Sequence, residues 1–417
     1  MLGVVCLDFR IVFILILEAA LAMVLLWRCG ALRSRAQWAV GLAAVVLAFA
    51  LRALALDHET LDYQNFLSPW VTFYRENGGF RALWRPVGNY NIPYLYFMAL
   101  FSYSSIRDLY LIKCLSILFD VLLAWGSAEL LGVFCESAWR KLGCFACVLL
   151  LPTVILNGAF WGQCDSIYVA FAVLALWQGL KGRPVTAMIC LALSFGFKLQ
   201  AIFVIPVFAL LLLKGKLKWY HLAVFPAAYV LLVLPAVLLG RPFLDTLLLY
   251  ANQTGSVGSA LNYNSSSIFG IFWHVADEQT AATTAIAAAA CYSLLVLIAA
   301  SLFRDRLSDR AILCAAVLFA VGIPFFLPHM HDRYFFAADI LTLVLAFAIP
   351  WVLPVAPLTQ FASLLGYHAY IYMRFLLPMR YGSWSLIAVL ALTAAAFARE
   401  LYHCGGSTPK RIPYLGK

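Results

Sequence analysis

Apolar segments long enough to cross a bilayer recur along the whole chain, and this repetition constrains the fold more than any other feature. A helix needs about 20 apolar residues to cross roughly 30 Å of hydrocarbon. Helices also satisfy every backbone hydrogen bond internally, as the bilayer requires. The sequence therefore predicts an all-α polytopic membrane protein of about 13 transmembrane helices. We place the spans near 11–27, 38–56, 107–132, 143–157, 166–180, 184–198, 199–213, 219–239, 280–303, 311–327, 335–351, 360–377 and 383–401.

The composition excludes most other classes of protein. Of the 417 residues, 65% are hydrophobic and 12% are charged, whereas a soluble domain carries about 25% charged residues. A soluble enzyme, a nucleic-acid-binding domain, and a disordered or collagen-like chain are therefore excluded. The 11 cysteines lie mostly inside apolar runs. Cys144 and Cys147 form a C-x-x-C without a second pair, so we interpret them as packing residues rather than as a metal or disulfide site.

Basic residues predict the orientation in the membrane. The net charge is +10, and Lys and Arg concentrate in cytoplasmic loops of membrane proteins. With the spans above, all basic clusters fall on one side, which places the N-terminus outside and the C-terminus inside. We expect one transmembrane domain over 1–404 and a short cytoplasmic tail over 405–417. The clusters are Arg28/Arg33/Arg35, Arg140/Lys141, Lys181/Arg183, Lys214/Lys216/Lys218, Arg304/Arg306/Arg310, and Arg399 with Lys410, Arg411 and Lys417.

Two predicted outer segments are longer than plain turns. In the first, 57–106, aromatic residues recur at helical spacing, which predicts helices lying in the membrane interface. The second, 240–279, contains the Gly/Ser/Asn-rich stretch NQTGSVGSALNYNSSS, which is predicted to be an ordered or mobile loop. The recurring aromatic residues of the first segment are Tyr63, Phe66, Trp70, Phe73 and Tyr74.

Acids in or beside spans are costly and point to function. Asp57 and Asp62 begin the first outer segment, where either could be a general base or simply cap the interfacial helix. Asp165, at the mouth of a later span, could bind a sugar hydroxyl or a cation, or cap the helix that follows. Lys113 and Asp120 share one face of one span, which favours a salt bridge or helix packing.

The segment PHMHDRY (328–334) is the densest polar cluster. His329, His331 and Arg333 could donate several hydrogen bonds to a phosphate. The alternative is a loop that needs charge to stay in the interface. A metal site is disfavoured because H-x-H lacks a nearby third ligand. Lys198 and Arg374 lie at outer span ends, where they could contact an anionic lipid head group or act as snorkelling anchors.

Five segments, in order, resemble motifs of the GT-C class of membrane glycosyltransferases. The resemblance is closest to bacterial relatives of the GPI mannosyltransferase family and more distant to the dolichyl-phosphate-glucose glucosyltransferases. It covers roughly residues 38–377. The chain departs from the latter enzymes at Asp332 and Arg333, which stand in place of Glu and Lys. The matching segments are LDYQNFLSPW (61–70), VGNYNIPYLYF (87–97), NGAFWGQCDSIY (157–168), FGFKLQAIFVIP (195–206) and PHMHDRYFF (328–336).

The resemblance implies a reaction and a site. An inverting transferase would move a hexose, mannose or glucose, from a polyprenyl-phosphate donor to a hydroxyl of a glycan or lipid-linked glycan at the outer face of a bacterial plasma membrane. It implies no cofactor, requires no metal and involves no nucleic acid. Asp62 is the base candidate, ahead of Asp57. The donor-phosphate candidates are Lys198, His329, His331, Arg333 and Arg374. The other substrate-binding candidates are Asn91, Tyr94, Trp161, Gln163, Asp165 and Gln200.

Two other functional classes fit the same composition. A lipid-linked-sugar flippase or transporter predicts polar residues along a central pathway and inverted repeats. A polysaccharide polymerase or ligase would also act on lipid-linked sugars outside the cell. We favour the transferase because the polar residues concentrate at one predicted face and no internal repeat is evident.

Overall fold

The computed structural model describes residues 8–253, 260–272 and 274–403, so the predicted tail 405–417 lies outside the described residues. The protein is 77% helical, which confirms the all-α membrane fold class. The α-helices are α1 Phe9–Arg28, α2 Arg35–Ala55, α3 Ser68–Glu76, α4 Ile92–Phe101, α5 Asp108–Leu131, α6 Ala138–Leu150, α7 Pro152–Ile155, α8 Asp165–Leu180, α9 Pro184–Phe197, α10 Val207–Leu213, α11 Val224–Leu238, α12 Phe243–Leu247, α13 Leu249–Gln253, α14 Glu278–Leu302, α15 Asp309–Phe326, α16 Phe336–Ala348, α17 Val355–Tyr372 and α18 Arg380–His403.

Short helical turns and two short strands complete the fold. The strands, β1 Asn262–Tyr263 and β2 Met330–His331, pair in parallel with Asn262 opposite Met330. The π-helical turns are η1 Tyr63–Leu67 and η3 Leu156–Trp161. The 3₁₀ turns are η2 Gly79–Trp84, η4 Leu199–Phe203, η5 Trp219–Ala223, η6 Ile268–Gly270, η7 Arg304–Arg306 and η8 Pro350–Val352.

The count of 13 spans is not confirmed. Seven helices of the described chain are long and apolar enough to cross a bilayer, or eight if α6 and the segment Pro152–Trp161, bent by 45°, form one broken span. The segment 199–213 is not one span, because it divides into η4 and α10. Several predicted spans are instead short helices: α8, α9 and α16 have 16, 14 and 13 residues.

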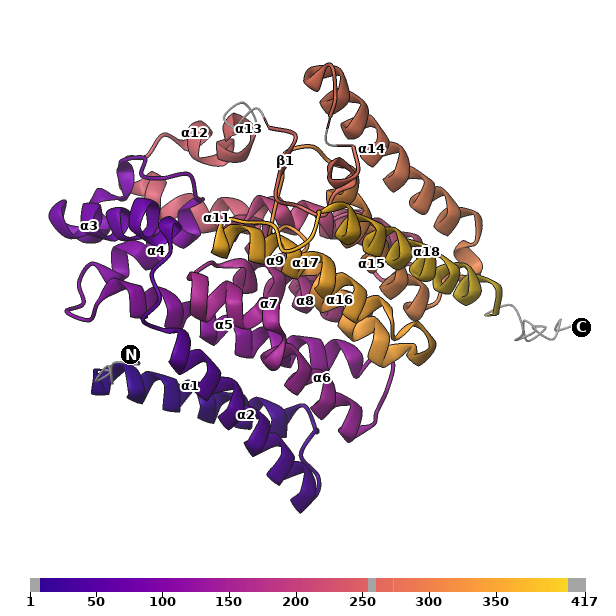
Figure 1. The fold of residues 1–417 in the computed structure, drawn as a ribbon, viewed down its shortest axis with the longest axis horizontal. Helices are drawn as coiled ribbons and strands as arrows, with labels where there is room; N and C mark the ends of the chain where they lie inside the picture. The colour runs from indigo at the N-terminus through magenta and orange to yellow at the C-terminus, as the bar shows by residue number, and fades with distance from the viewer. Residues whose placement is uncertain (1–7, 254–259, 273, 404–417) are drawn as a thin grey trace, which may run out of the picture.

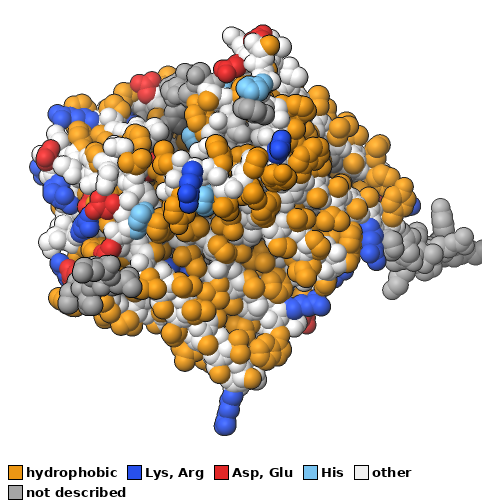
Figure 2. All heavy atoms as spheres, in the orientation of Figure 1, with side chains coloured by type: hydrophobic (Ala, Val, Ile, Leu, Met, Phe, Trp, Pro, Cys, Tyr) orange, Lys and Arg blue, Asp and Glu red, His pale blue; other side chains and the backbone are white. Residues whose placement is uncertain are grey.

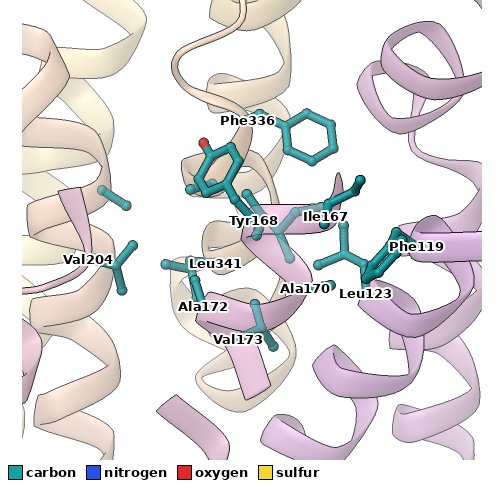
Figure 3. Packing of buried hydrophobic residues seen from close by; sticks show 14 of the residues in the cluster. Phe119, Leu123, Ile167, Tyr168, Ala170, Ala172, Val173, Val204, Phe336 and Leu341 are labelled. Atoms are coloured by element: carbon teal, nitrogen blue, oxygen red, sulfur yellow. The ribbon is translucent and has the colours of Figure 1, made fainter. Parts of the chain in front are cut away.

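The inner helices carry the core. Within its most apolar stretch, α5 is 72% buried and α15 is 83% buried, whereas α1, α2 and α14 are between 22% and 28% buried. Helix α8 packs against α5, α9 and α16. Figure 3 shows the contact of these layers: Phe119 and Leu123 of α5 meet Ile167 and Ala170 of α8. The short helices α8 and α16 are therefore largely covered by their neighbours, whereas α9 keeps Val185 and Ile189 exposed.

The helix ends follow local capping signals. Ser34 and Gln37 form a reciprocal capping box at the start of α2, and Asn91 caps α4 through its Oδ1. These side chains satisfy backbone N–H groups that the helices leave unpaired. Such caps fix where the chain leaves a helix and enters the loops described below.

The predicted outer segments gather at one end of the molecule. In Figure 1, α3 and α4 lie at the left and α12, α13 and β1 along the top, whereas the α1–α2 turn lies at the bottom and the α14–α15 turn at the right. The expectation of helices in the first outer segment is confirmed by η1, α3, η2 and α4. Figure 2 shows that the middle of this face is mostly apolar and that most visible Asp, Glu and His lie towards the upper left.

An ion pair lies inside the bundle. Arg52 of α2 and Asp120 of α5 are both fully buried, and Arg52 Nη2 lies 2.9 Å from Asp120 Oδ2. Ser166 of α8 donates to the other carboxylate oxygen. Of the two alternatives for Lys113 and Asp120, the salt bridge between them is therefore wrong. Lys113 instead donates to three backbone carbonyls at and after the end of α2, those of Ala55, Leu56 and His58, over 2.7–2.9 Å.

Candidate active site

Side chains from six separated segments meet at the end of the bundle that the sequence predicts to face outward. We call this group the outer cluster. It draws on η1, the loop before α4, the η3–α8 turn, the α9–η4 turn, the loop after β2, and α17. Its members are Asp62, Tyr90, Asn157, Trp161, Gln163, Asp165, Lys198, Asp332, Arg333, Tyr367 and Tyr370.

Asp62 is held by two neutral donors. Its Oδ2 accepts a hydrogen bond of 2.9 Å from Trp161 Nε1 and one of 2.6 Å from Gln163 Nε2. The carboxylate makes no capping hydrogen bond to the helical turn that it begins, so the capping alternative is wrong for this residue. Both of these hydrogen bonds reach Oδ2, and Tyr370 also lies close enough to interact with the carboxylate. The Asp62 side chain is only half-buried, so an incoming group can approach it.

Asp165 joins two cations. It is the first residue of α8 and is 1% exposed. Lys198 Nζ lies 2.5 Å from its Oδ1, and Arg333 Nε lies 3.7 Å from its Oδ2. Asn157 Nδ2 donates to the same Oδ2 over 2.7 Å. One carboxylate thus fixes two positive side chains that are 135 positions apart in the sequence.

Trp161 connects the two carboxylates. Tyr370 stacks on its ring with centroids 3.9 Å apart, and the Arg333 guanidinium lies 5.1 Å from the ring centroid. Its indole N–H meanwhile points to Asp62. Because Trp161 and Tyr94 are almost fully buried, direct contact of a substrate with either ring, the role that the resemblance implies, would need a rearrangement. In this arrangement Trp161 serves to orient Asp62.

The remaining substrate-binding candidates lie beside this group. Gln163 accepts from the Tyr90 hydroxyl over 3.0 Å, which fixes the amide that donates to Asp62. Asn91 caps α4 and donates to the Tyr229 hydroxyl over 3.0 Å, so its side chain is occupied structurally. Gln200 in η4 is buried, and its Oε1 has no hydrogen-bond partner in the described part of the chain.

The PHMHDRY loop is tied to the second outer segment. The His329 N–H donates to the Leu261 carbonyl over 2.8 Å, and the His331 ring stacks on Tyr263 with centroids 4.6 Å apart. Gly366 of α17 lets the helix approach both loops, because a Cβ there would lie 2.8 Å from the carbonyl oxygens of Asn264 and Asp332. The loop is therefore built into the fold rather than merely held at the interface by its charge.

Burial alters the protonation of this loop. It lowers the pKa of His331 to about 3, with Arg333 and Lys198 adding to the effect, so the imidazole is neutral at physiological pH. Burial also raises the pKa of Asp332 to about 7; Arg333 opposes this shift, while Asp62 and Asp165 add to it. His331 can therefore supply a hydrogen bond but not a full positive charge.

Two candidates lie apart from the cluster. Asp57 accepts a hydrogen bond of 2.6 Å from the Tyr110 hydroxyl and, within the described residues, forms no hydrogen bond with a side chain of the outer cluster. Arg374 is exposed in the turn after α17, and its side chain forms no ion pair with the described residues. Sequence reasoning missed Tyr90 and Tyr370, although Tyr90 stands within the NYNIPYLYF segment that was noted.

The described residues contain no cluster of side chains arranged to bind a metal ion. Within the ranges that the structure describes, no three His, Cys, Asp or Glu side chains gather closely enough to hold an ion. His329 and His331 point to different partners, because His329 Nδ1 lies 2.8 Å from the Ala260 carbonyl while His331 stacks on Tyr263.

Comparison with known proteins gives a family match. The sequence model described as Glycosyltransferase family 87 matches residues 89–321, which is more than half of the chain. The matched range contains Trp161, Gln163, Asp165 and Lys198 but ends before the PHMHDRY loop. No curated protein matches the chain.

Proposed function

Because the chain belongs to glycosyltransferase family 87, a family of GT-C-type membrane glycosyltransferases, we propose that it is an inverting hexosyltransferase that uses a polyprenyl-phosphate sugar. The sugar is mannose or glucose, and the acceptor is a hydroxyl of a glycan or lipid-linked glycan on the extracytoplasmic side of a bacterial plasma membrane. The observation that carries the proposal is the convergence of Asp62 with Lys198 and Arg333 at one end of the bundle.

Asp62 takes the role of general base in this proposal. It removes the proton from the acceptor hydroxyl as the oxygen attacks the anomeric carbon of the donor sugar. Trp161 and Gln163 hold one carboxylate oxygen, and the acceptor can approach the half-buried side chain. The new bond forms on the face opposite the phosphate, so the configuration at the anomeric carbon inverts.

Lys198 and Arg333 take the role of phosphate binders. The bond between the anomeric carbon and the phosphate oxygen breaks, and its electron pair leaves with the polyprenyl phosphate. The diester of the donor carries one negative charge and the released monoester carries up to two, so fixed cations favour the transition state. Asp165 holds both cations in place, and we propose His329 and His331 as further donors to the phosphate.

An apolar groove supports a lipid donor. A hollow of about 400 Å³ lies between α9 and α11, and aliphatic side chains such as Leu193 and Leu232 line it. Helix α9 ends at Phe197, immediately before Lys198. A polyprenyl chain in this groove would thus lead along α9 to a phosphate at Lys198.

The first test replaces Asp62 by asparagine and uses Asp57→Asn as the matched control. Asp57 lies five positions earlier but bonds to Tyr110. With purified enzyme and a polyprenyl-phosphate hexose, we expect Asp62→Asn to lower kcat by about 10²–10⁴-fold, the usual contribution of a general base, with little change in donor binding. Asp57→Asn should retain activity. Full turnover by Asp62→Asn would reject the assignment of Asp62, and loss of activity in Asp57→Asn alone would transfer the role to that residue.

The second test addresses the donor. Lys198→Gln should raise KM for the polyprenyl-phosphate sugar more than it lowers kcat, because it removes a charge that faces the phosphate in both ground and transition state. Arg374→Gln is the control, since Arg374 is exposed and lies outside the outer cluster. Equal effects of the two variants would contradict the placement of the phosphate beside Lys198.

A further inference from the structure

A second concave region lies at the opposite end of the bundle from the outer cluster. Helix α15 runs from Asp309 to Phe326, so its 18 residues separate the two ends by about 27 Å. The PHMHDRY loop follows the C-terminal end of α15, whereas the Arg304–Arg306 turn precedes its N-terminal end. Figure 1 shows α14 descending to this end, beside α18. A ligand bound there would not contact the proposed transfer site.

This region combines an apolar groove with a polar hollow. The groove, about 480 Å³ in volume, lies between α10 and α14 and is lined by aliphatic side chains such as Leu213 and Leu297 until Ser301 and Arg304 close it. A polar hollow of about 510 Å³ begins at the next residue, Lys214. The two hollows together match the two parts of an amphiphilic molecule. The aliphatic groove suits an apolar chain, and the polar hollow beside it carries basic side chains.

The basic residues of the polar hollow are not neutralised by its acids. Asp309 is already engaged by Lys214 and Lys216, at 3.1 and 2.8 Å. In the described chain, neither Arg306 nor Arg310 forms an ion pair, and both are exposed. Guanidinium groups match phosphate oxygens in two parallel hydrogen bonds. The polar end of the region therefore favours a phosphate group.

Arg304, at the junction of the two hollows, is also available. Its Nε lies 3.9 Å from Asp305 Oδ1, and both side chains are highly exposed, at 66% and 98%. Exposed pairs of this kind contribute little free energy, so Arg304 can turn to another anion without an appreciable loss. Helix α14 is only 22% buried in its most apolar stretch, so the groove is accessible from the surrounding lipid.

We propose that this region binds one anionic diacyl phospholipid of the surrounding membrane, with an acyl chain between α10 and α14 and its phosphate against Arg306 and Arg310. Charge complementarity selects an anionic over a zwitterionic head group, and the aliphatic groove selects a lipid over a soluble phosphate. The site is distinct from the proposed donor site, because it lies at the other end of α15.

The test compares two double variants of equal charge. Delipidated protein in detergent is titrated with dioleoyl phosphatidylglycerol, dioleoyl phosphatidylcholine or glycerol 3-phosphate, and bound ligand is counted by native mass spectrometry. Each basic residue near an anionic lipid contributes roughly a fivefold gain in affinity. Arg306→Gln/Arg310→Gln should therefore weaken phosphatidylglycerol binding by about 30-fold. The control Arg33→Gln/Arg35→Gln, in the exposed α1–α2 turn, should change it by less than about threefold.

The groove is tested separately. Ala209→Phe, and independently Leu297→Trp, fill it from its two walls and should abolish preferential lipid retention while thermal unfolding stays close to that of the parent protein. Equal losses in the two arginine double variants would overturn the proposal in favour of diffuse attraction. Unchanged binding in both groove variants would overturn it too, as would glycerol 3-phosphate binding as tightly as phosphatidylglycerol. Because none of these residues belongs to the outer cluster, failure here leaves the Asp62 test unaffected.

Discussion

Replacement of Asp165 by asparagine removes the carboxylate that holds two buried cations. The Asp165 and Lys198 side chains are 1% and 8% exposed, and that of Arg333 is 14% exposed. Removal of one partner from a buried pair costs about 3–5 kcal/mol, because the other charge stays desolvated. Arg333 keeps Asp332 as a partner at 3.4 Å, so we expect a loss of about 3 kcal/mol in the free energy of unfolding.

The assay is SDS-induced unfolding in mixed micelles, with a charge-matched control. Asp309→Asn also removes a carboxylate from two lysines, but Asp309 is 31% exposed, so its loss should cost at most about 1 kcal/mol. The double variant Asp165→Asn/Lys198→Met should recover much of the stability, because no unpaired charge remains at Lys198. The reasoning is refuted if Asp165→Asn costs no more than Asp309→Asn, or if the two substitutions at 165 and 198 are simply additive.

Three further predictions concern the same site. Trp161→Phe keeps an aromatic ring, although a smaller one, but removes the N–H donor to Asp62. We therefore expect kcat to fall by about tenfold or more while donor KM stays constant, and an unchanged kcat would contradict this role. Gly366→Ala places a methyl group 2.8 Å from two backbone carbonyl oxygens and should cost about 1–3 kcal/mol in unfolding experiments, whereas a neutral result would show that the loops can shift. Folded Asp332 binds a proton more tightly than the unfolded chain, whose pKa is near 3.8, because burial raises its pKa to about 7. Stability from this group should thus fall by roughly 1.4 kcal/mol per pH unit between about pH 4 and 7, and Asp332→Asn should abolish that slope.

The membrane fold class and the grouping of outer motifs could be predicted from the sequence. Apolar runs indicate which segments contact lipid or the protein core, and the basic clusters indicate which loops lie on the cytoplasmic side of the membrane. On that basis Asp62, Lys198 and Arg333 were expected on one face, and the structure places them in one cluster. Asp165 was also identified, although its pairing with both cations was not.

The number of spans and the interior partners could not be predicted in the same way. Apolar composition does not distinguish a helix that crosses lipid from one shielded by neighbours, so the short α8 and α16 were counted as spans. The residue with which a buried charge forms an ion pair depends on which helices pack against each other in the fold. Asp120 forms an ion pair with Arg52 of α2, which lies 68 positions earlier in the sequence, rather than with Lys113 on its own helix. A charged residue inside the apolar run 38–56 was the available signal.

The surroundings of the three carboxylates in the outer cluster determine which of them could act as a base. Asp165 is 1% exposed and both of its oxygens have partners, so it cannot reach an acceptor without releasing Lys198. Asp332 is 4% exposed, and its raised pKa leaves it partly protonated near neutral pH. Asp62 alone of the three is half-buried, and the donors to its Oδ2, Trp161 and Gln163, are uncharged. The base role that we propose for Asp62 thus follows from its neighbours, since all three side chains are chemically identical.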